Sequence, residues 1–553
     1  MTGPMLEISL VLFYRPVALA ILHIEYLAWG VEPLAYLLTS FVVHCLNVLL
    51  VFMVMRNMMR KLSAWYAVGV SLIFAIYPIH PNTVSFIAAT TALFCTTFLL
   101  GAFLQYQKYE QRKKQFHLVA SAALFCAALG CYEQAVVFPL MIVSLRILKI
   151  GIDDTPISRS DILGWAVLIS LLIAYLFVRY LALGEFEGGY RNSLSLIDSR
   201  SAQTLIYNFF VNFVHIINPN WLVPIPAWLS WCAGLLLLAT FLLNAFKFRG
   251  NQLAVLFNCS VIWVILGQLP FLFYTIVPGA GRYWYLPSVG VGLFIVISVV
   301  WLARVITVWL PRNYRPTVAI ILLMVVASYY FGLLQYYSHE YQLAGLRTQQ
   351  IQKKLGEIVN NTDDMVFVRG HPAHHRDENG NPIAQVFHWG LSDSVKPPFL
   401  PNASPVYPLL QSRKGDLLPV SSISERAQLW EWDHEQEQFL QIHTNFNIEK
   451  DNLKRIEVLD LGSGQIRISV EPGTRYDLIV AGEANMSRSG IDLQSKMDRS
   501  VLVEIPQHFV ASNKQLYAGG VYFWIEGRAR NKQLNSISDM YKVQEPDSQV
   551  RER

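Results

Sequence analysis

The sequence predicts a polytopic α-helical membrane protein with about ten transmembrane helices, followed by a C-terminal β-rich soluble domain. First, 53% of the 553 residues are apolar and only 15% are charged, against roughly 25% charged residues in an average soluble domain. Second, the mean hydropathy is +0.35, and the composition changes from apolar to polar at residue 345. Third, the first 152 residues contain no aspartate. These observations exclude an ordinary soluble enzyme, a disordered chain and a basic nucleic-acid-binding protein.

Ten stretches of the N-terminal part are candidates for membrane spans. A span needs about 20 largely apolar residues, and fewer where neighbouring helices shield its ends. The candidate stretches are residues 36–55, 64–79, 85–104, 117–131, 134–148, 162–183, 225–245, 253–275, 285–304 and 317–337. The fourth and fifth stretches are short, and we expect them to form a tight hairpin.

The loops between these stretches alternate in charge, which predicts their orientation. One set of loops holds nearly all the basic residues: Arg56, Arg60, Lys61, Lys108, Arg112, Lys113, Lys114, Arg146, Lys149, Arg159, Lys247, Arg249, Arg304, Arg312 and Arg315. The alternate loops hold only Arg191, Arg200 and Arg282. The positive-inside rule places the first set in the cytoplasm, so ten spans put the C-terminal domain outside the cytoplasm.

Residues 8–29 are apolar enough to span a membrane, but Arg15-Pro16 and Glu25 interrupt them, and no basic residue precedes them. A helix lying in the interface of the outer leaflet, within a segment that covers residues 1–30, explains this pattern better than a span. The alternative is a plain first transmembrane helix with a mild kink at Pro16. We therefore assign residues 1–345 to the transmembrane domain.

Residues 346–553 have the pattern of a small β-rich domain. Short alternating or β-branched runs begin at Met365, Arg455, Gln465, Tyr476, Val501 and Val521. Glycines separate these runs, as expected for strands that are joined by turns. Residues 371–381 contain three histidines but no fixed metal-ligand spacing, so a solvated loop is favoured over a metal site.

Ionisable and aromatic side chains gather at the predicted outer ends of the spans. The segments concerned are residues 13–16, 77–81, 130–134, 179–191 and 281–288. Burying polar groups at membrane depth costs free energy, so a cluster of them at one leaflet indicates a functional site. We select Arg15, Arg191 and Arg282 as ligands of a phosphate group, because a guanidinium fork binds phosphate oxygens bidentately.

His80, Glu133 and Tyr283 are the further candidates for the substrate pocket. A carboxylate such as Glu133 binds a sugar hydroxyl or acts as a base. Each candidate also has a purely structural alternative. Arg15, Arg179 and Arg282 would snorkel to lipid headgroups, and Tyr283 would belong to an aromatic belt with Trp284 and Tyr285. His80 would only cap a helix, and Glu133 would pair with one arginine.

The same segments carry a family resemblance. They are Arg15-Pro16, Trp29-Gly30, a helix with His44 and Asn47, Phe74-Ala-Ile-Tyr-Pro-Ile-His-Pro, Tyr132-Glu-Gln, residues 183–190 and Arg282-Tyr-Trp-Tyr-Leu-Pro-Ser-Val-Gly. In this order, over residues 13–300, they resemble GT-C-type polytopic membrane glycosyltransferases of the protein O-mannosyltransferase-like branch. That branch includes proteins with tetratricopeptide tails. The resemblance implies a polyprenyl-phosphate sugar as donor and transfer to an acceptor on the outer face.

The chain departs from the family pattern in several places. The family uses an acidic residue in the first outer loop, close after a first transmembrane helix, whereas Glu7 is the only acid before Arg15 here. After His80, where relatives often place an arginine and an acid, the chain reads Ile87-Ala-Ala-Thr-Thr-Ala, and its tail has no tetratricopeptide repeat. Two explanations are open. The chain starts late and has lost its first helix and catalytic loop, or it is a relative that binds a lipid carrier or glycan without turnover.

The resulting hypothesis is a GT-C-like glycosyltransferase of a bacterial inner membrane that moves a sugar from a polyprenyl-phosphate donor to an extracytoplasmic protein or glycan acceptor. The catalytic residue is unknown, because the usual acidic loop is absent. No cofactor is certain, a divalent metal is left open, and no metal ligand is assigned. The lipid bilayer is an expected partner and nucleic acid is not. The main alternative is a non-catalytic membrane scaffold or glycan-binding protein, and a transporter or flippase is the weaker one, since broken helices and internal repeats are not evident.

Overall fold

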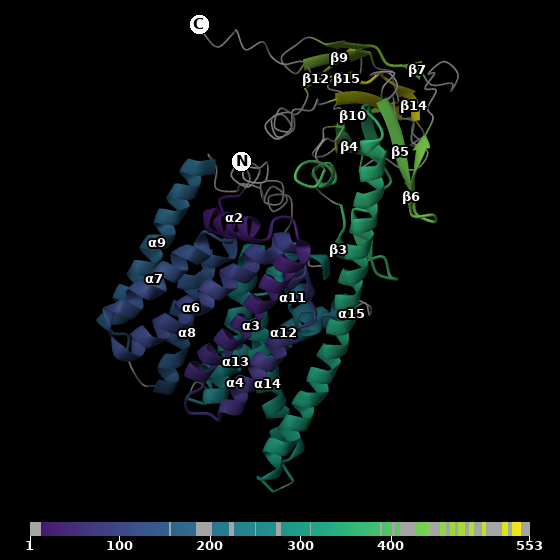
Figure 1. Ribbon diagram of the computed structural model, residues 1–553. Helices are drawn as coiled ribbons and strands as arrows, with labels where there is room; N and C mark the ends of the chain where they lie inside the picture. The colour runs from purple at the N-terminus through teal and green to yellow at the C-terminus, as the bar shows by residue number, and fades with distance from the viewer. Residues whose placement is uncertain are drawn as a thin grey trace. The chain divides into compact units, whose positions relative to one another are not determined.

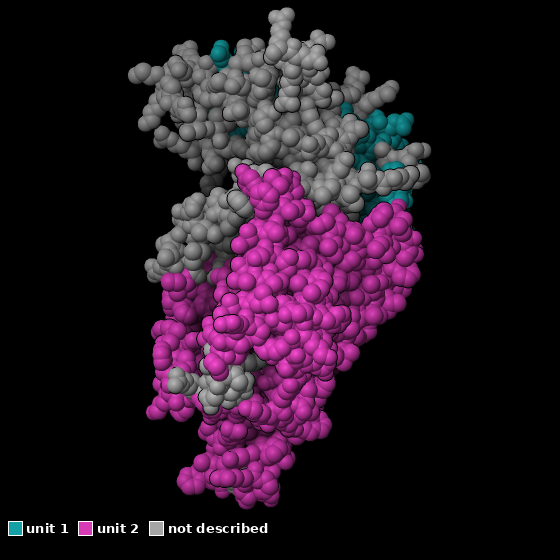
Figure 2. Space-filling model, turned by 90° about the vertical axis from the view of Figure 1, so that its left-hand side faces the viewer, with its two compact units in different colours: residues 1–8, 343–375, 385–553 teal, residues 9–342, 376–384 magenta. Residues whose placement is uncertain are grey.

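The computed structural model describes residues 13–153, 156–183, 202–220, 226–248, 250–271, 278–309, 311–387, 390–400, 404–409, 427–442, 454–460, 465–469, 474–481, 486–490, 500–504, 522–528 and 534–542. The chain divides into two compact units, coloured separately in Figure 2. The membrane unit comprises residues 9–342 and 376–384. The C-terminal unit comprises residues 1–8, 343–375 and 385–553.

The membrane unit is helical (Figure 1). Its α-helices are α2 (Pro16–Trp29), α3 (Pro33–Met58), α4 (Ala64–Ala75), α5 (Pro81–Val84), α6 (Thr90–Arg112), α7 (Gln115–Leu129), α8 (Phe138–Asp153), α9 (Arg159–Leu183), α11 (Ala202–Ile217), α12 (Ala227–Phe246), α13 (Gln252–Gln268), α14 (Pro287–Ile306) and the start of α15 (Tyr314–Asn360). Short 3₁₀ turns join several of them: η1 (Ile87–Ala89), η2 (Glu133–Val137), η4 (Leu269–Phe271) and η5 (Pro278–Trp284). Proline occupies the first turn of α2, α3, α5 and α14, where its missing N–H would be unbonded in any case.

The predicted fold class is confirmed. Seven helices of the described residues are long and apolar enough to cross a membrane, and they coincide with seven of the ten predicted spans. The other three predicted spans coincide with the shorter helices α4, α7 and α8. The segment predicted as an outer loop between α9 and α12 contains a further helix, α11, which the sequence analysis did not anticipate. In Figure 1, α2 runs across α3 rather than alongside it.

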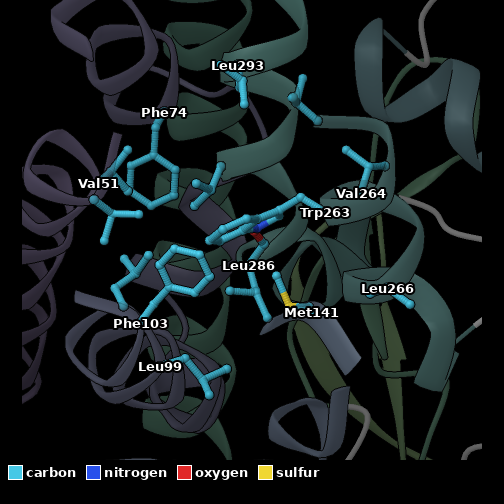
Figure 3. Packing of buried hydrophobic residues seen from close by; sticks show 14 of the residues in the cluster. Val51, Phe74, Leu99, Phe103, Met141, Trp263, Val264, Leu266, Leu286 and Leu293 are labelled. Atoms are coloured by element: carbon cyan, nitrogen blue, oxygen red, sulfur yellow. The ribbon is translucent and has the colours of Figure 1, made fainter. Parts of the chain in front are cut away.

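The core of the membrane unit is a continuous set of large side chains. Figure 3 shows Phe103 beside Trp263, and the centroids of the two rings are 5.2 Å apart. The Trp263 indole N–H donates to the carbonyl oxygen of Leu286 at 3.1 Å, which ties α13 to the turn before α14. Many apolar side chains on α3, α9, α12 and α15 are instead exposed, including Phe41 at 56% and Ile173 at 62%. An apolar exterior of this kind suits lipid, where packing and polar satisfaction rather than hydrophobic burial hold helices together.

The C-terminal unit is built mainly from strands. They are β1 (Met365–Arg369), β2 (His374–Arg376), β3 (Pro382–Gln385, mostly in the membrane unit), β4 (Val406–Leu409), β5 (Ala427–Asp433), β6 (Gln438–Ile442), β7 (Lys454–Arg455), β8 (Val458–Asp460), β9 (Gln465–Ser469), β10 (Arg475–Ala481), β11 (Met486–Gly490), β12 (Ser500–Glu504), β13 (Tyr522–Arg528), β14 (Leu534–Ile537) and β15 (Tyr541–Lys542). One sheet has the order β4-β1-β5-β6, in which β1 is parallel to both of its neighbours. Other strands form the orders β11-β10-β13-β14-β7 and β12-β9-β8. Each predicted strand run contains an observed strand.

Residues 371–381 differ from the expected solvated loop. They include β2 and a turn in which the backbone N–H of Asn381 donates to Asp377 Oδ1 at 2.7 Å. His371 and His375 are buried, and burial lowers the pKa of His371 to about 4. A neutral, enclosed imidazole explains why three nearby histidines do not make this stretch a polar surface loop.

Candidate functional site

The start of α2 is fixed against the turn that follows α7. The backbone N–H groups of Val17 and Ala18 donate to the carbonyl oxygen of Gly130 at 2.9 and 3.2 Å. A Cβ atom at Gly130 would lie only 2.5 Å from Val17 Cγ2, so this close approach requires glycine. The contact places Arg15, which directly precedes α2, beside Glu133 at the start of η2.

Arg15, Glu133 and Arg179 form a buried charge cluster, which we call the arginine–carboxylate cluster. Arg15 Nη2 and Nε donate to Glu133 Oε2 at 2.7 and 3.1 Å, and Nε also lies 3.2 Å from Oε1. Arg179 Nη1, from α9, donates to Glu133 Oε1 at 3.3 Å. The three side chains are 15%, 11% and 5% exposed in this order of residues. One carboxylate therefore serves two guanidinium groups from different parts of the chain.

The electrostatics of this cluster favour an anion. Burial by itself raises the pKa of Glu133, which lies in the turn between α7 and α8, but the charge and hydrogen bonds of Arg15 and the charge of Arg179 lower it below its ordinary value. Glu133 is therefore ionised at neutral pH, and the three residues together comprise two guanidinium charges and one carboxylate charge. Aromatic rings enclose it: the Arg15 guanidinium carbon lies 4.3 Å from the centroid of the Phe13 ring and 4.6 Å from that of Tyr132.

The residues on either side of Glu133 connect the cluster to η5. The Gln134 side-chain nitrogen donates to the carbonyl oxygens of Gly267, at 2.6 Å, and Tyr283, at 3.0 Å. Phe271 stacks on Tyr132 with a centroid distance of 5.6 Å and packs against Tyr283 at 4.3 Å. Two of the predicted site residues, Glu133 and Tyr283, are thus linked through Gln134.

Arg282 is held next to the turn that contains His80. Its backbone N–H donates to Asn82 Oδ1 at 2.7 Å, and its guanidinium lies over the Tyr283 ring at 4.8 Å. A Cβ atom at Gly281 would lie 2.2 Å from Ile79 Cγ2, so η5 approaches residues 79–82 as closely as glycine permits. Asn82 also donates to the Tyr341 hydroxyl, which in turn donates to the carbonyl oxygen of Ile383 at 3.0 Å.

His80 belongs to a buried polar network rather than to the charge cluster. Ser288 donates its hydroxyl to the Tyr285 carbonyl at 2.7 Å, so it accepts from His80 Nε2 at 3.0 Å. His44 Nε2 faces the Ala75 carbonyl at 3.2 Å and must donate to it. His44 Nδ1 then accepts from the Tyr285 hydroxyl at 2.7 Å, and that hydroxyl accepts from Asn47 at 3.2 Å. The network joins α3, α4 and α14.

The structure therefore connects five of the six predicted site residues through short chains of contacts. Arg15 and Glu133 touch directly, Arg282 and Tyr283 touch directly, and His80 lies two positions before Asn82, the partner of Arg282. Arg191 lies outside the described residues. Among the described residues, no group of three or more His, Cys, Asp or Glu side chains is placed to hold a metal ion.

Sequence reasoning missed several residues that the site uses. Arg179 and Gln134 lie in segments that the sequence singled out, residues 179–191 and 130–134, but neither was chosen as a site residue. Asn82 and Tyr341 gave no signal, because neutral polar side chains are common at helix ends. Glu25 is also notable: it is 5% exposed on α2, and neither of its carboxylate oxygens has a hydrogen-bond partner.

The comparisons with known proteins find relatives that are named protein O-mannosyl-transferases. No family model matches the chain. The chain is 31% identical over 123 residues to the protein O-mannosyl-transferase Tmtc1 of Drosophila melanogaster, covering 22% of this chain and 14% of that protein. It is 29% identical over 126 residues to the protein O-mannosyl-transferase TMTC3 of Mus musculus, covering 22% and 13%, and 25% identical over 264 residues to TMTC4 of Homo sapiens, covering 40% and 35%. The matched segments thus span about a third or less of each relative's length.

Proposed function

We propose that this protein is an integral membrane glycosyltransferase of the GT-C type, which transfers a sugar from a polyprenyl-phosphate donor to an extracytoplasmic acceptor. The observation that carries the proposal is the arginine–carboxylate cluster, in which two arginines share a single carboxylate. Two guanidinium groups thus converge in a largely buried site beside aromatic rings, and guanidinium groups bind phosphate oxygens with matching geometry. The distant similarity to proteins named protein O-mannosyl-transferases supports the same class of reaction.

In the proposed reaction, an acceptor hydroxyl attacks the anomeric carbon of the sugar, and the bond from that carbon to the phosphate oxygen breaks. The leaving phosphate gains negative charge in this step. Arg15 and Arg179 are placed to stabilise that charge, with Arg282 and Arg191 as the further proposed donors to phosphate. His80 and Tyr283 are proposed to line the pocket. The proton of the acceptor hydroxyl leaves to a base that we do not assign.

Glu133 takes a different role from a general base in this proposal. Both of its oxygens accept hydrogen bonds from guanidinium groups, and its lowered pKa makes it a poor proton acceptor. We assign it as a positioning residue that holds the two arginines at the spacing a phosphate needs. The same observation favours a second candidate function, a membrane protein that binds a lipid-linked glycan without turnover.

The proposal includes a location and a division of the chain. We propose a bacterial inner membrane, a transmembrane domain over residues 1–345 with an interfacial segment at 1–30, and an extracytoplasmic β-rich domain over residues 346–553. The positive-inside distribution of arginine and lysine supports this orientation. Labelling of single cysteines introduced into the C-terminal unit, from the outside of intact cells, tests it: failure of the reagent to reach them contradicts the orientation.

Glycan analysis of a deletion strain tests the activity. The strain is complemented with the wild type, with Arg179→Gln, or with Arg146→Gln. Arg146 is the matched control, since it is a buried arginine of the same unit, 11% exposed, that pairs with Asp161 at 3.4 Å instead of with Glu133. We expect wild type and Arg146→Gln to restore the glycan that the deletion removes, and Arg179→Gln to fail. An unchanged glycan profile in the deletion strain would refute the transferase, and donor binding without turnover by the purified wild type would favour the second candidate.

A further inference from the structure

We propose that Gln134 and Gln268 form a subsite that binds the hydroxyl groups of a sugar beside the arginine–carboxylate cluster. This inference rests on the proposed function, and it names the residues that would recognise the sugar rather than the phosphate. It is carried by three buried amide atoms that have no hydrogen-bond partner in the part of the chain that the structure describes: the side-chain oxygen of Gln134, the residue after Glu133, and both amide atoms of Gln268 at the end of α13.

The orientation of the Gln134 amide follows from its neighbours. It faces two backbone carbonyl oxygens, those of Gly267 and Tyr283, so the amide nitrogen must point at them and the amide oxygen must point away. That oxygen is buried and has no hydrogen-bond partner in the described part of the chain. Gln134 itself is fully buried. Its side chain thus offers one acceptor that the protein does not use.

Gln268 lies next to Gly267, the residue whose carbonyl oxygen accepts from Gln134. It is 2% exposed, and among the described residues neither its amide oxygen nor its amide nitrogen has a hydrogen-bond partner. Buried amides without any partner are rare, since each loses its bonds to water on burial. Apolar residues would fill the same volume at lower cost, so a wholly unbonded amide here indicates that a ligand supplies the partners.

The chemistry of the unused atoms restricts that ligand. Gln134 and Gln268 present two free acceptors and one free NH₂ donor. A phosphate has only acceptor oxygens at its ionised positions, so it cannot bond to the two amide oxygens. Hydroxyl groups both donate and accept, and several of them on one neutral ring satisfy all three atoms. A ligand that carries several hydroxyl groups, such as the sugar of the proposed donor, therefore fits these atoms, whereas an ionised phosphate does not.

The position of the subsite agrees with a single bound donor. Gln134 directly follows Glu133 in η2, and the carbonyl oxygen of Gly267 bonds Gln134 to the end of α13. In the proposed arrangement, a phosphate held by Arg15 and Arg179 presents its attached sugar to the two amides. The subsite would then set which sugar is accepted, while the arginines would bind any donor of this kind.

The test measures sugar binding and stability in the same variants. The full chain in lipid nanodiscs is titrated with methyl α-mannoside, followed by thermal protection and by saturation-transfer NMR. Gln268→Met removes the amide at nearly constant volume, and Gln268→Leu is the second variant. We expect both to weaken mannoside binding roughly tenfold, because the hydrogen bonds to the hydroxyls are lost. We also expect both to leave the ligand-free unfolding temperature unchanged or higher, since an unbonded buried amide has been removed.

The control is Gln107→Met. Gln107 is a buried amide of the same unit, 3% exposed, whose nitrogen donates to the Val54 carbonyl at 3.3 Å. We expect this variant to bind mannoside as the wild type does. The proposal is overturned if neither methyl α-mannoside nor its gluco and galacto epimers protect the wild type saturably against thermal unfolding. It is also overturned if an acetylated peptide protects the wild type instead of a sugar. Loss of stability in the Gln268 variants with an unchanged affinity for the mannoside would overturn it as well. Mannoside binding and thermal stability are measured without sugar transfer. A protein that transfers no sugar can therefore still show whether the two glutamines bind one.

Discussion

Removing the charge of Glu133 should destabilise the membrane unit strongly, whereas removing the whole cluster should not. Glu133→Gln leaves Arg15 and Arg179 buried around a neutral amide. Each guanidinium–carboxylate contact, with atoms 2.7 and 3.3 Å apart, corresponds to about 5–6 kcal/mol of attraction at an effective dielectric constant near 20. Desolvation offsets much of this, and breaking such a buried pair by removing one partner costs about 3–5 kcal/mol.

The comparison variant is the triple substitution Arg15→Met, Glu133→Leu and Arg179→Met. Replacing a complete buried ion cluster by apolar side chains of similar volume is often neutral, or stabilising by about 1–4 kcal/mol. Equilibrium unfolding in mixed micelles, followed by tryptophan fluorescence, measures both variants against the wild type. If the Glu133→Gln protein is as stable as the wild type, the carboxylate does not stabilise the two buried arginines. If the triple variant is as unstable as Glu133→Gln, the loss of stability does not come from uncompensated arginine charge. A stable triple variant that no longer binds donor would show that the charges are retained for function.

Three further predictions concern the supports of the site. Gly130→Ala should cost about 1–3 kcal/mol of stability, because its Cβ would overlap Val17, and Val17→Ala in the same chain should recover most of the loss in the same unfolding assay. Tyr285→Phe should cost about 1–3 kcal/mol by leaving His44 and Asn47 without their shared hydroxyl, and a cost below the error of the measurement would contradict the network. Acidification should weaken the wild type more than Glu133→Gln: the folded pKa of Glu133 lies below its ordinary value of 4.5, so its stabilisation is present above pH 4.5 and is lost as the pH falls below that value.

Most of the fold was predictable because lipid imposes a simple rule on sequence. A segment that crosses a bilayer must bond its backbone internally and present apolar side chains, so spans such as α9 and α14 read as long apolar runs. The helix α11 escaped prediction because Asn208, Asn212 and His215 interrupt its apolar residues. Those polar side chains lie on a helix that the protein, rather than lipid, partly covers: Asn208 and Asn212 are 5% and 1% exposed.

The C-terminal strands were predictable where β-branched or aromatic residues alternate, as in β10 and β13. The sheet order was not, since parallel β1 pairs with both β4 and β5, which are distant in sequence. Strands such as β5 (Ala427–Asp433) were missed because charged residues share them with two tryptophans. Pairing across long separations depends on tertiary packing, which local patterns do not encode.

The functional site, like the fold, was only partly predictable from the sequence. Arg15, Glu133 and Arg282 could be identified because a charged side chain in an apolar segment is costly to bury and is usually functional. Their partners were not predictable: Arg15 and Glu133 are 118 positions apart in the chain, and the second arginine, Arg179, comes from another helix. Neutral amides such as Gln268 were not visible at all, because a glutamine becomes informative only when its burial and missing partners are known.

Equilibrium binding of a polyprenyl-phosphate mannose tests directly whether the arginine–carboxylate cluster binds the phosphate of the donor. The purified full chain in nanodiscs is titrated with the radiolabelled donor, alongside Arg179→Gln and the control Arg146→Gln. We expect saturable binding by the wild type and by Arg146→Gln. We expect Arg179→Gln to lose affinity for the donor roughly tenfold or more, since a hydrogen bond between charged groups contributes about 1.5–3 kcal/mol. Absence of saturable binding by the wild type, or equal affinity in all three proteins, would contradict it.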